Sequence, residues 1–161
     1  MSSFNDILYR LLYRCAYQVM QCYWRLFRQA THGVQILLWV DDSVLLIRNS
    51  YRAGYTFPGG HINHNETTLQ AAVRELQEEV GITVSSNQLQ KTQDITYFRN
   101  GVACSETLFN CQLEKMPEVL IDNREVIEAK FASITEAKSL HLQKSAQEYL
   151  SLSSHYASAI Y

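Results

Sequence analysis

The sequence predicts one mixed α/β domain of the α+β class, preceded by a long amphipathic helix. Strand-like segments come in hairpin pairs, a well-capped helix lies between them, and a separate helical pattern stands before the first strand. The chain has 161 residues, of which 47% are apolar and 19% are charged, values typical of one folded domain. We therefore expect a helical segment over residues 1–30 and the domain proper over residues 31–161.

Residues 4–29 have the apolar spacing of one helix. Large apolar side chains recur at steps of three and four residues from Phe4 to Phe27, without Gly or Pro, and the Arg residues lie largely outside this stripe. The stripe can dock on the domain, pair with a second copy in a homodimer, or lie on an anionic membrane. Docking or dimerisation is favoured over peripheral membrane contact, because most amphipathic helices face a protein core.

The next segment predicts a hairpin and a short third strand. Thr31-His32-Gly33 breaks the helical pattern, after which residues 34–40 and 43–48 are typical of paired strands. Residues 55–57 predict a short strand that runs into the turn signal Pro58-Gly59-Gly60.

Residues 67–80 predict the best-defined helix of the chain. Thr67 and Gln70 form a capping-box pattern, apolar residues repeat at helical spacing from Leu69 to Val80, and Gly81 stands where a glycine ends a helix. Two further strands, a last strand and one C-terminal helix follow; they are expected at residues 92–98, 102–113, 126–134 and 135–150, with the hairpin turn at Asn100-Gly101.

Charge and cysteine content exclude several classes of protein. The net charge is −2, and since residues 1–30 carry four Arg and one Asp (+3), the rest of the chain carries −5. Nothing here indicates specific nucleic-acid binding, and an acidic body repels polyphosphates unless a divalent cation intervenes. The four cysteines lack zinc-site spacing, and no signal peptide or bilayer-spanning run is evident, which favours a cytoplasmic protein with reduced thiols.

Three glutamates on the predicted central helix point to metal chemistry. On a wheel of about 100° per residue, with Leu69 at zero, Glu78, Glu75 and Glu79 fall at roughly 180°, 240° and 280°. They share one edge of the helix, beside its buried face. Carboxylates spaced in this way repel each other, and a hard divalent cation relieves that repulsion. Arg74 is adjacent and can brace one of them.

Fixed residues surround these glutamates at regular intervals, namely Gly60, Glu66, Arg74-Glu75-Leu76, Glu78-Glu79 and Gly81-Ile82. This spacing resembles the Nudix box, Gly-x5-Glu-x7-Arg-Glu-U-x-Glu-Glu-x-Gly-U with U aliphatic, and every specified position matches. With the Pro58-Gly59 lead-in and the flanking strand pattern, the resemblance covers about residues 34–150.

The resemblance to the Nudix hydrolase (MutT-like) family implies a fold and a reaction. The fold is an α/β/α sandwich with a mixed central sheet. The reaction is metal-dependent hydrolysis of a diphosphate linkage in a nucleoside diphosphate joined to another group, as in a nucleotide sugar, a dinucleotide or a nucleoside triphosphate. Mg²⁺ is the expected cofactor, and Mn²⁺ can substitute.

The resemblance also assigns roles to residues of the box. The metal ligands implied are Glu75, Glu78 and Glu79, often joined by the backbone carbonyl of Gly60, with Arg74 also in the catalytic group. The positions with structural roles in the motif are Gly60, Glu66 and Gly81.

The general base of this family often lies outside the box. The acidic segment before the last predicted strand offers Glu125 first and Glu128 second, although a charged surface loop explains them equally well.

Substrate contacts are less well defined by the sequence. The three cationic candidates for phosphate contacts are Arg48, Arg52 and Arg99. Tyr97 stands near the place where dinucleoside-polyphosphate hydrolases carry a base-stacking aromatic, but a packed strand residue is the commoner role.

Two other classes compete with a hydrolase. An isomerase on the same scaffold calls for a catalytic Cys, yet none lies between residues 23 and 103. A non-catalytic nucleotide-binding sensor often lacks box glutamates, whereas all are present here. Hydrolysis is therefore preferred, with the sensor as the alternative.

Overall fold

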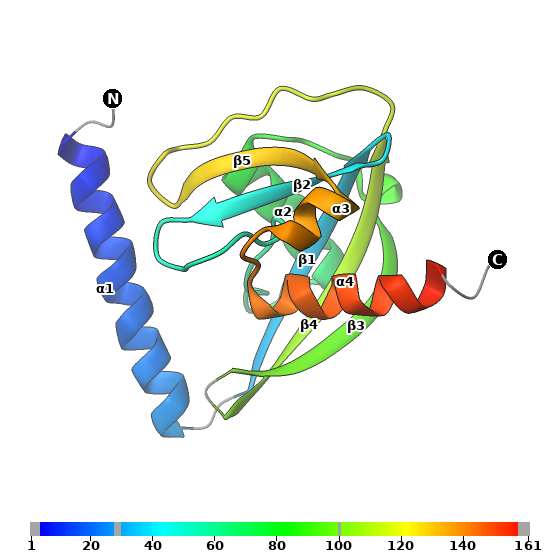
Figure 1. The fold of residues 1–161 in the computed structure, drawn as a ribbon. Coiled ribbons are helices and arrows are strands. Elements are labelled where there is room, and N and C mark those ends of the chain that lie inside the picture. Colours follow the sequence, from blue (N-terminus) through cyan, green and yellow to red (C-terminus); the bar gives the residue numbers. More distant parts are fainter. Residues whose placement is uncertain (1–3, 28–29, 100, 158–161) are drawn as a thin grey trace.

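A mixed five-stranded sheet forms the centre of the protein (Figure 1). The computed structural model describes residues 4–27, 30–99 and 101–157. The sheet has the order β3-β4-β1-β2-β5, with β1 parallel to β4 and the other neighbours antiparallel. The strands are β1 (Thr31–Val40), β2 (Ser43–Asn49), β3 (Gln90–Arg99), β4 (Val102–Leu113) and β5 (Val126–Ser133).

Helices cover both faces of the sheet, so the predicted α/β/α sandwich is confirmed. On one face α2 (Thr68–Val80) shares a buried cluster with alternate strand residues such as Ile36. On the other face α3 (Ile134–Ser139) and α4 (Lys144–Ala157) share a second cluster that includes Leu37. Successive strand residues point to opposite faces, which explains why β1 is apolar on both sides. A short 3-10 turn, η1 (Ser86–Gln88), follows α2.

Residues 56–60 fill a gap between the first two strands. β1 pairs with β2 only at Trp39 and Val40, so the beginning of β1 has a free edge on that side. Backbone hydrogen bonds attach the inserted segment to both strands; they join Ile47 to Thr56, Ile36 to Pro58 and Val34 to Gly60. The insertion carries the backbone of Gly59 and Gly60 up to the side chains of α2.

Gly59 is required by this close approach. Its φ is 148°, and a Cβ built on it would lie 2.1 Å from the carbonyl oxygen of Val34. Gly59→Ala is therefore expected to lower the free energy of unfolding by about 3 kcal/mol, because backbone cannot yield as a side chain can. Gly101→Ala is the matched control: its φ is also positive, at 79°, but nothing lies within 4 Å. It should cost only about 1 kcal/mol. Urea denaturation measures both variants. If Gly59→Ala and Gly101→Ala lose the same free energy of unfolding, the close approach of Gly59 to Val34 is not the reason for the glycine.

Two predicted elements differ most clearly from the observed ones. The first strand begins at Thr31 and not at residue 34, because parallel pairing with β4 starts at Thr31 and Cys104. The single helix expected over residues 135–150 is two helices, α3 and α4. Between them the backbone bonds to Tyr55, which donates to the His141 carbonyl and accepts from the Gln143 amide, both at 2.8 Å. These long-range bonds interrupt the helix.

The N-terminal helix α1 (Phe4–Phe27) lies beside the sandwich (Figure 1). Arg10 and Arg14 donate to the carbonyl oxygens of Asn123 and Ser50, at 2.8 and 2.9 Å. Tyr13 and Tyr17 of the same side pack on the ring of Tyr51, with centroids 6.3 and 5.0 Å away. The helix thus contacts the domain through its polar and aromatic side, and the alternative in which its apolar stripe docks on the domain is wrong.

The apolar stripe of α1 faces outward instead. Its exposed members include Phe4, Ile7, Leu8, Leu11, Leu12, Val19 and Leu26. Pairing with a second copy, or contact with a membrane surface, stays a prediction for this face. No helix within the described ranges is long and apolar enough to cross a bilayer.

Candidate functional site

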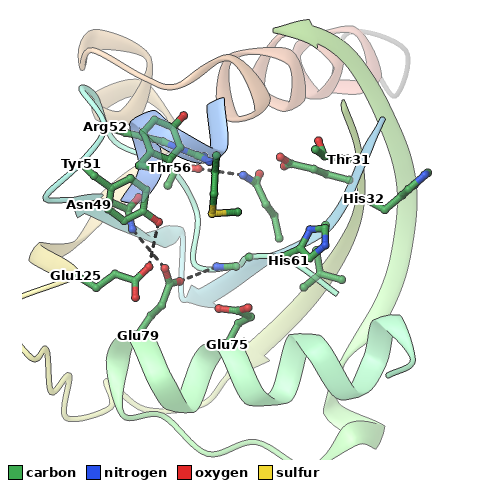
Figure 2. Close-up of a pocket in the computed structure, with 18 of the residues that line it drawn as sticks. Thr31, His32, Asn49, Tyr51, Arg52, Thr56, His61, Glu75, Glu79 and Glu125 are labelled. Atoms are coloured by element: carbon green, nitrogen blue, oxygen red, sulfur yellow. Dashed lines mark hydrogen bonds between the residues drawn. The ribbon is translucent and has the colours of Figure 1, made fainter. Parts of the chain in front are cut away.

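A cavity of about 430 Å³ lies above the first strand and between α1 and α2 (Figure 2). Its size is within the usual range of roughly 300–1,000 Å³ for small-molecule sites. Glu75 and Glu79 rise from α2 on one side, and Glu125 stands next to Glu79 (Figure 2). Arg52 and Thr56 lie across the cavity from these carboxylates. The cavity therefore has an acidic end and an opposite, mixed polar end.

Glu79 is a buried carboxylate, with 6% of its surface exposed. Its Oε2 accepts a 2.7 Å hydrogen bond from the Gly59 amide, and its Oε1 accepts a 3.4 Å bond from Asn49. No ion pair to Glu79 occurs in the part of the chain that the structure describes. Burial raises the pKa of Glu79 well above its usual range, the Gly59 bond lowers it, and the nearby Glu75 and Glu125 raise it further. This environment favours either a proton or a bound cation.

Arg74 joins three glutamates of the motif. Its Nε and Nη2 donate to both oxygens of Glu66, at 2.8 and 2.9 Å, and its Nη1 donates to Glu75 at 2.8 Å and Glu78 at 2.9 Å. Nη2 also donates to the His61 carbonyl at 2.9 Å, which ties the inserted loop to the helix. The bonds from Arg74 lower the pKa of Glu66, whose carboxyl therefore stays ionised as a structural acceptor.

Glu75 faces the backbone of Gly60 so closely that a Cβ there would overlap its carboxyl group. Burial raises the pKa of Glu75, and the bond from Arg74 opposes this shift. The Gly60 carbonyl accepts from the Val34 amide at 2.9 Å, so only its second lone pair is available to an ion. Gly81 ends α2 in the left-handed conformation, with φ of 70°.

Glu125 is held in the cavity by its own loop and by a tyrosine. Asp122 accepts from the backbone amides of the three residues from Arg124 to Val126, which fixes the turn. The Tyr51 hydroxyl donates to Glu125 at 3.0 Å. Burial raises the pKa of Glu125, and the bond from Tyr51 lowers it. Glu125 thus faces the same space as Glu79.

The acidic end has the donor chemistry for a hard cation but is not gathered around one. Among residues 4–27, 30–99 and 101–157, no three His, Cys, Asp or Glu side chains form a metal-binding cluster. Arg74 bonds to Glu75 and Glu78, so a cation competes with its guanidinium for them. Neighbouring carboxylates nevertheless raise the pKa of Glu75 and of Glu79, so a cation at this end of the cavity would relieve their repulsion. Carboxylate oxygens are also the ligands that Mg²⁺ prefers.

Comparison with known proteins identifies the family. Residues 30–152 match the family model described as NUDIX domain. The chain belongs to the Nudix hydrolase family. An 8-oxo-dGTP diphosphatase of Proteus vulgaris is 50% identical over 44 residues, which are 27% of this chain and 39% of that relative. The chain spans less than half the length of the curated relatives it matches.

Solved Nudix structures share the fold. An Ap4A hydrolase from C. elegans has a TM-score of 0.65 at 22% identity, covering 80% of this chain and 98% of that one. A MutT Nudix hydrolase from Burkholderia pseudomallei has a TM-score of 0.66 at 19% identity, covering 76% and 97%. These likenesses agree with the sandwich and its mixed sheet.

The structure brings only some of the predicted substrate residues of this Nudix domain into the cavity. Arg52 and Arg99 line it. Arg48 does not, because it pairs at 2.8 Å with Glu128, its cross-strand neighbour on β5. Glu128 therefore does not line the cavity either. The second candidate for the general base thus lies outside the cavity. Tyr97 is buried under the cavity wall with its hydroxyl on another side chain, so it is not placed to stack on a base.

Several lining residues were not foreseen. Tyr13, Tyr17 and Met20 come from α1, which precedes the family match, and Gln35 and Glu106 come from the central strands. Their signals are visible in hindsight. The two tyrosines are spaced by four on the side away from the apolar stripe, and Gln35 is a polar residue inside a strand that is apolar on both faces.

Proposed function

We propose that this Nudix domain hydrolyses a diphosphate linkage in a nucleoside diphosphate joined to another group, with a divalent metal ion. The observation that carries the proposal is the buried carboxylate of Glu79, which has no ion pair among the described residues, beside Glu75 and Glu125 at one end of a ligand-sized cavity. Such an end repels a polyphosphate unless a cation lies between them. The complete motif and the family match support the same reaction.

The residues proposed to hold the ion are Glu75, Glu78 and Glu79, with the Gly60 carbonyl as a further oxygen. Their donors are all oxygen atoms, which suits Mg²⁺, and Mn²⁺ accepts the same set. When bound, the ion supplies neutralisation of the diphosphate and a lower pKa of the attacking water. Gly59 and Asn49 keep Glu79 oriented toward the cavity by their hydrogen bonds.

Glu125 is proposed to accept the proton of the attacking water. Its pKa is raised by burial, which brings a carboxylate closer to the range in which a general base works at neutral pH. Tyr51 holds one of its oxygens, so the other can face water.

Glu125→Gln is therefore expected to lower kcat by about 10²-fold with little change in KM. Glu128→Gln is the matched control, since Glu128 lies three residues away but outside the cavity lining, and it should retain turnover. Initial rates at saturating substrate and Mg²⁺ measure both. Full kcat in Glu125→Gln would remove Glu125 from the mechanism.

The function itself is tested by turnover of a substrate panel with Mg²⁺ and with a chelator. The names of similar proteins suggest 8-oxo-dGTP, Ap4A and ADP-ribose as its members. We expect release of phosphate, pyrophosphate or a nucleoside monophosphate from one or more of them, only with the metal. Metal-dependent binding without turnover of any member would instead favour a nucleotide sensor on this scaffold.

A further inference from the structure

Hydrogen bonds, an ion pair and ring contacts join the N-terminal helix α1 to two short loops of the domain. One loop follows β2 and contains Ser50 and Tyr51, and the other precedes β5 and ends at Glu125. Both loops lie on the side of the sandwich that faces α1 (Figure 1). They carry the proposed base and the tyrosine whose hydroxyl bonds to it (Figure 2). The helix therefore contacts the part of the domain that holds Glu125.

The central sheet does not fix these two loops directly. The ladder between β2 and β5 ends at the pair Asn49 and Val126. Tyr51 and Glu125 lie beyond that last pair, in connecting segments that are ordinarily more mobile than the strands they follow. The Ser50 amide donates to the Glu125 carbonyl at 2.8 Å, so the two loops are joined to each other. A contact that fixes one loop therefore also helps to fix the other.

Two arginines of α1 hold the loops by their backbone. Arg10 donates to the carbonyl of Asn123 at 2.8 Å, and Arg14 donates to the carbonyl of Ser50 at 2.9 Å. Asn123 lies two positions before Glu125 in the chain. Hydrogen bonds from a charged donor are stronger than those between neutral groups. Each loop is thus attached to a long helix close to the functional carboxylate.

Other side chains of α1 hold the same loops. The Tyr51 ring packs on the rings of Tyr13 and Tyr17, whose centroids lie 6.3 and 5.0 Å away. Arg124, the residue directly before the proposed base, pairs with Asp6 at 3.2 Å. The base therefore lies between two points that α1 anchors, namely its tyrosine partner and its own backbone.

We infer that α1 positions Glu125 for the hydrolytic step. The inference rests on the proposed function, in which Glu125 accepts the proton of the attacking water, and it makes Arg10 and Arg14 positioning residues. The helix precedes residues 30–152, which match the Nudix family model. The proposed metal ligands come from the matched region, whereas the alignment of the base comes from outside it.

Replacing both arginines by alanine tests the inference. We expect Arg10→Ala/Arg14→Ala to lower kcat about tenfold with KM within about twofold, because displacing a catalytic group by about 1 Å can cost about 10²-fold and other α1 contacts remain. Neither arginine belongs to the described lining of the cavity, so the loss cannot come from a substrate contact. Arg10→Lys/Arg14→Lys should recover most of kcat, since an ammonium also donates to a carbonyl. Gln18→Ala, at an exposed position of the same helix, is the control and should retain kcat.

A double-mutant cycle separates positioning from a merely structural effect. In a Glu125→Gln background the two alanine substitutions should lower kcat by less than about twofold, because the group that they misplace is gone. A tenfold loss in both backgrounds would overturn the inference, and so would full kcat in Arg10→Ala/Arg14→Ala. If thermal unfolding shows that this variant does not fold, Arg10→Ala alone takes its place in the cycle, with an expected loss of about threefold.

Amide hydrogen exchange tests the same contacts without any turnover. The Ser50 amide, which bonds to the Glu125 carbonyl, should exchange at least about tenfold faster in Arg10→Ala/Arg14→Ala. The Ile47 amide, which bonds to Thr56, should keep its rate. Metal-dependent turnover by the unsubstituted protein, combined with unchanged Ser50 exchange in the variant, would refute the inference alone. Absence of that turnover would refute the proposed function and, with it, the role of α1 in catalysis.

Discussion

Glu79→Gln is expected to reduce metal-dependent turnover by about 10³-fold. Glutamine keeps the shape and the bond from the Gly59 amide but removes the buried charge that faces the cavity. A bound metal contributes several kcal/mol of transition-state stabilisation, and each 1.4 kcal/mol is about tenfold in rate. Hydrolysis rates at saturating Mg²⁺ measure the loss, and Glu114→Gln, which changes an exposed glutamate, is the control.

The same substitution should stabilise the metal-free protein at neutral and alkaline pH. The pKa of Glu79 is raised above its ordinary value of 4.5, so the folded state prefers the protonated carboxyl. The stability that this preferred protonation of Glu79 contributes is complete below pH 4.5 and is lost as the pH rises through the raised pKa. Glutamine does not ionise, so the Tm of the wild type should fall relative to the variant as the pH rises. A Tm difference independent of pH in the presence of a chelator would contradict this explanation.

Mg²⁺ should reverse that order of stability. A cation that binds the ionised carboxylate stabilises only the protein that retains it, by an amount that grows with the ion's concentration above its Kd. The wild type should therefore gain Tm with Mg²⁺ at pH 8 more than Glu79→Gln does. This comparison separates a metal ligand from a carboxyl group that is merely buried.

The helix α2, which carries most of the Nudix box, was predictable because the residues that determine it are neighbours in the sequence. Thr67 accepts from the Gln70 amide as the capping-box pattern indicates, and Gly81 adopts the left-handed conformation expected at a C-terminus. The mixed α/β class followed from strand and helix periodicity for the same reason, whereas the sandwich was implied by the resemblance to the Nudix family. Elements set by neighbouring residues in the chain are thus the ones that the sequence predicts correctly.

The burial of Glu79 was not predictable in this way. The helical wheel places it at the edge of the core, but residues 56–60 insert between β1 and β2 and cover it. That insertion depends on the point at which the pairing of β1 with β2 ends, and no local sequence pattern predicts that point. The side of α1 that contacts the domain was missed for a similar reason, since Arg10 and Arg14 bind carbonyls of distant loops and leave the apolar stripe outside.

Arg74→Ala is expected to lower the free energy of unfolding of the metal-free protein at pH 7 by about 3 kcal/mol. Its guanidinium donates to Glu66, Glu75 and Glu78 and to the His61 carbonyl. Breaking a buried ion pair costs about 3–5 kcal/mol, and the 25% exposure of the Arg74 side chain places the effect at the lower end. Arg74→Lys should recover less than half, because one ammonium cannot serve acceptors on opposite sides. Urea denaturation measures all three proteins.

The loss should also depend on pH in a direction that identifies its cause. Arg74 lowers the pKa of Glu66 below the ordinary value of 4.5, so this pair contributes stability above pH 4.5 and loses it as the pH falls through the lowered pKa. The difference between wild type and Arg74→Ala should therefore shrink in acid. Mg²⁺ should also reduce it at pH 7, since a cation bound by Glu75 and Glu78 takes over part of the neutralisation that Arg74 provides. A difference unchanged by acid and by Mg²⁺ would mean that Arg74 acts through packing of its side chain and not through its charge.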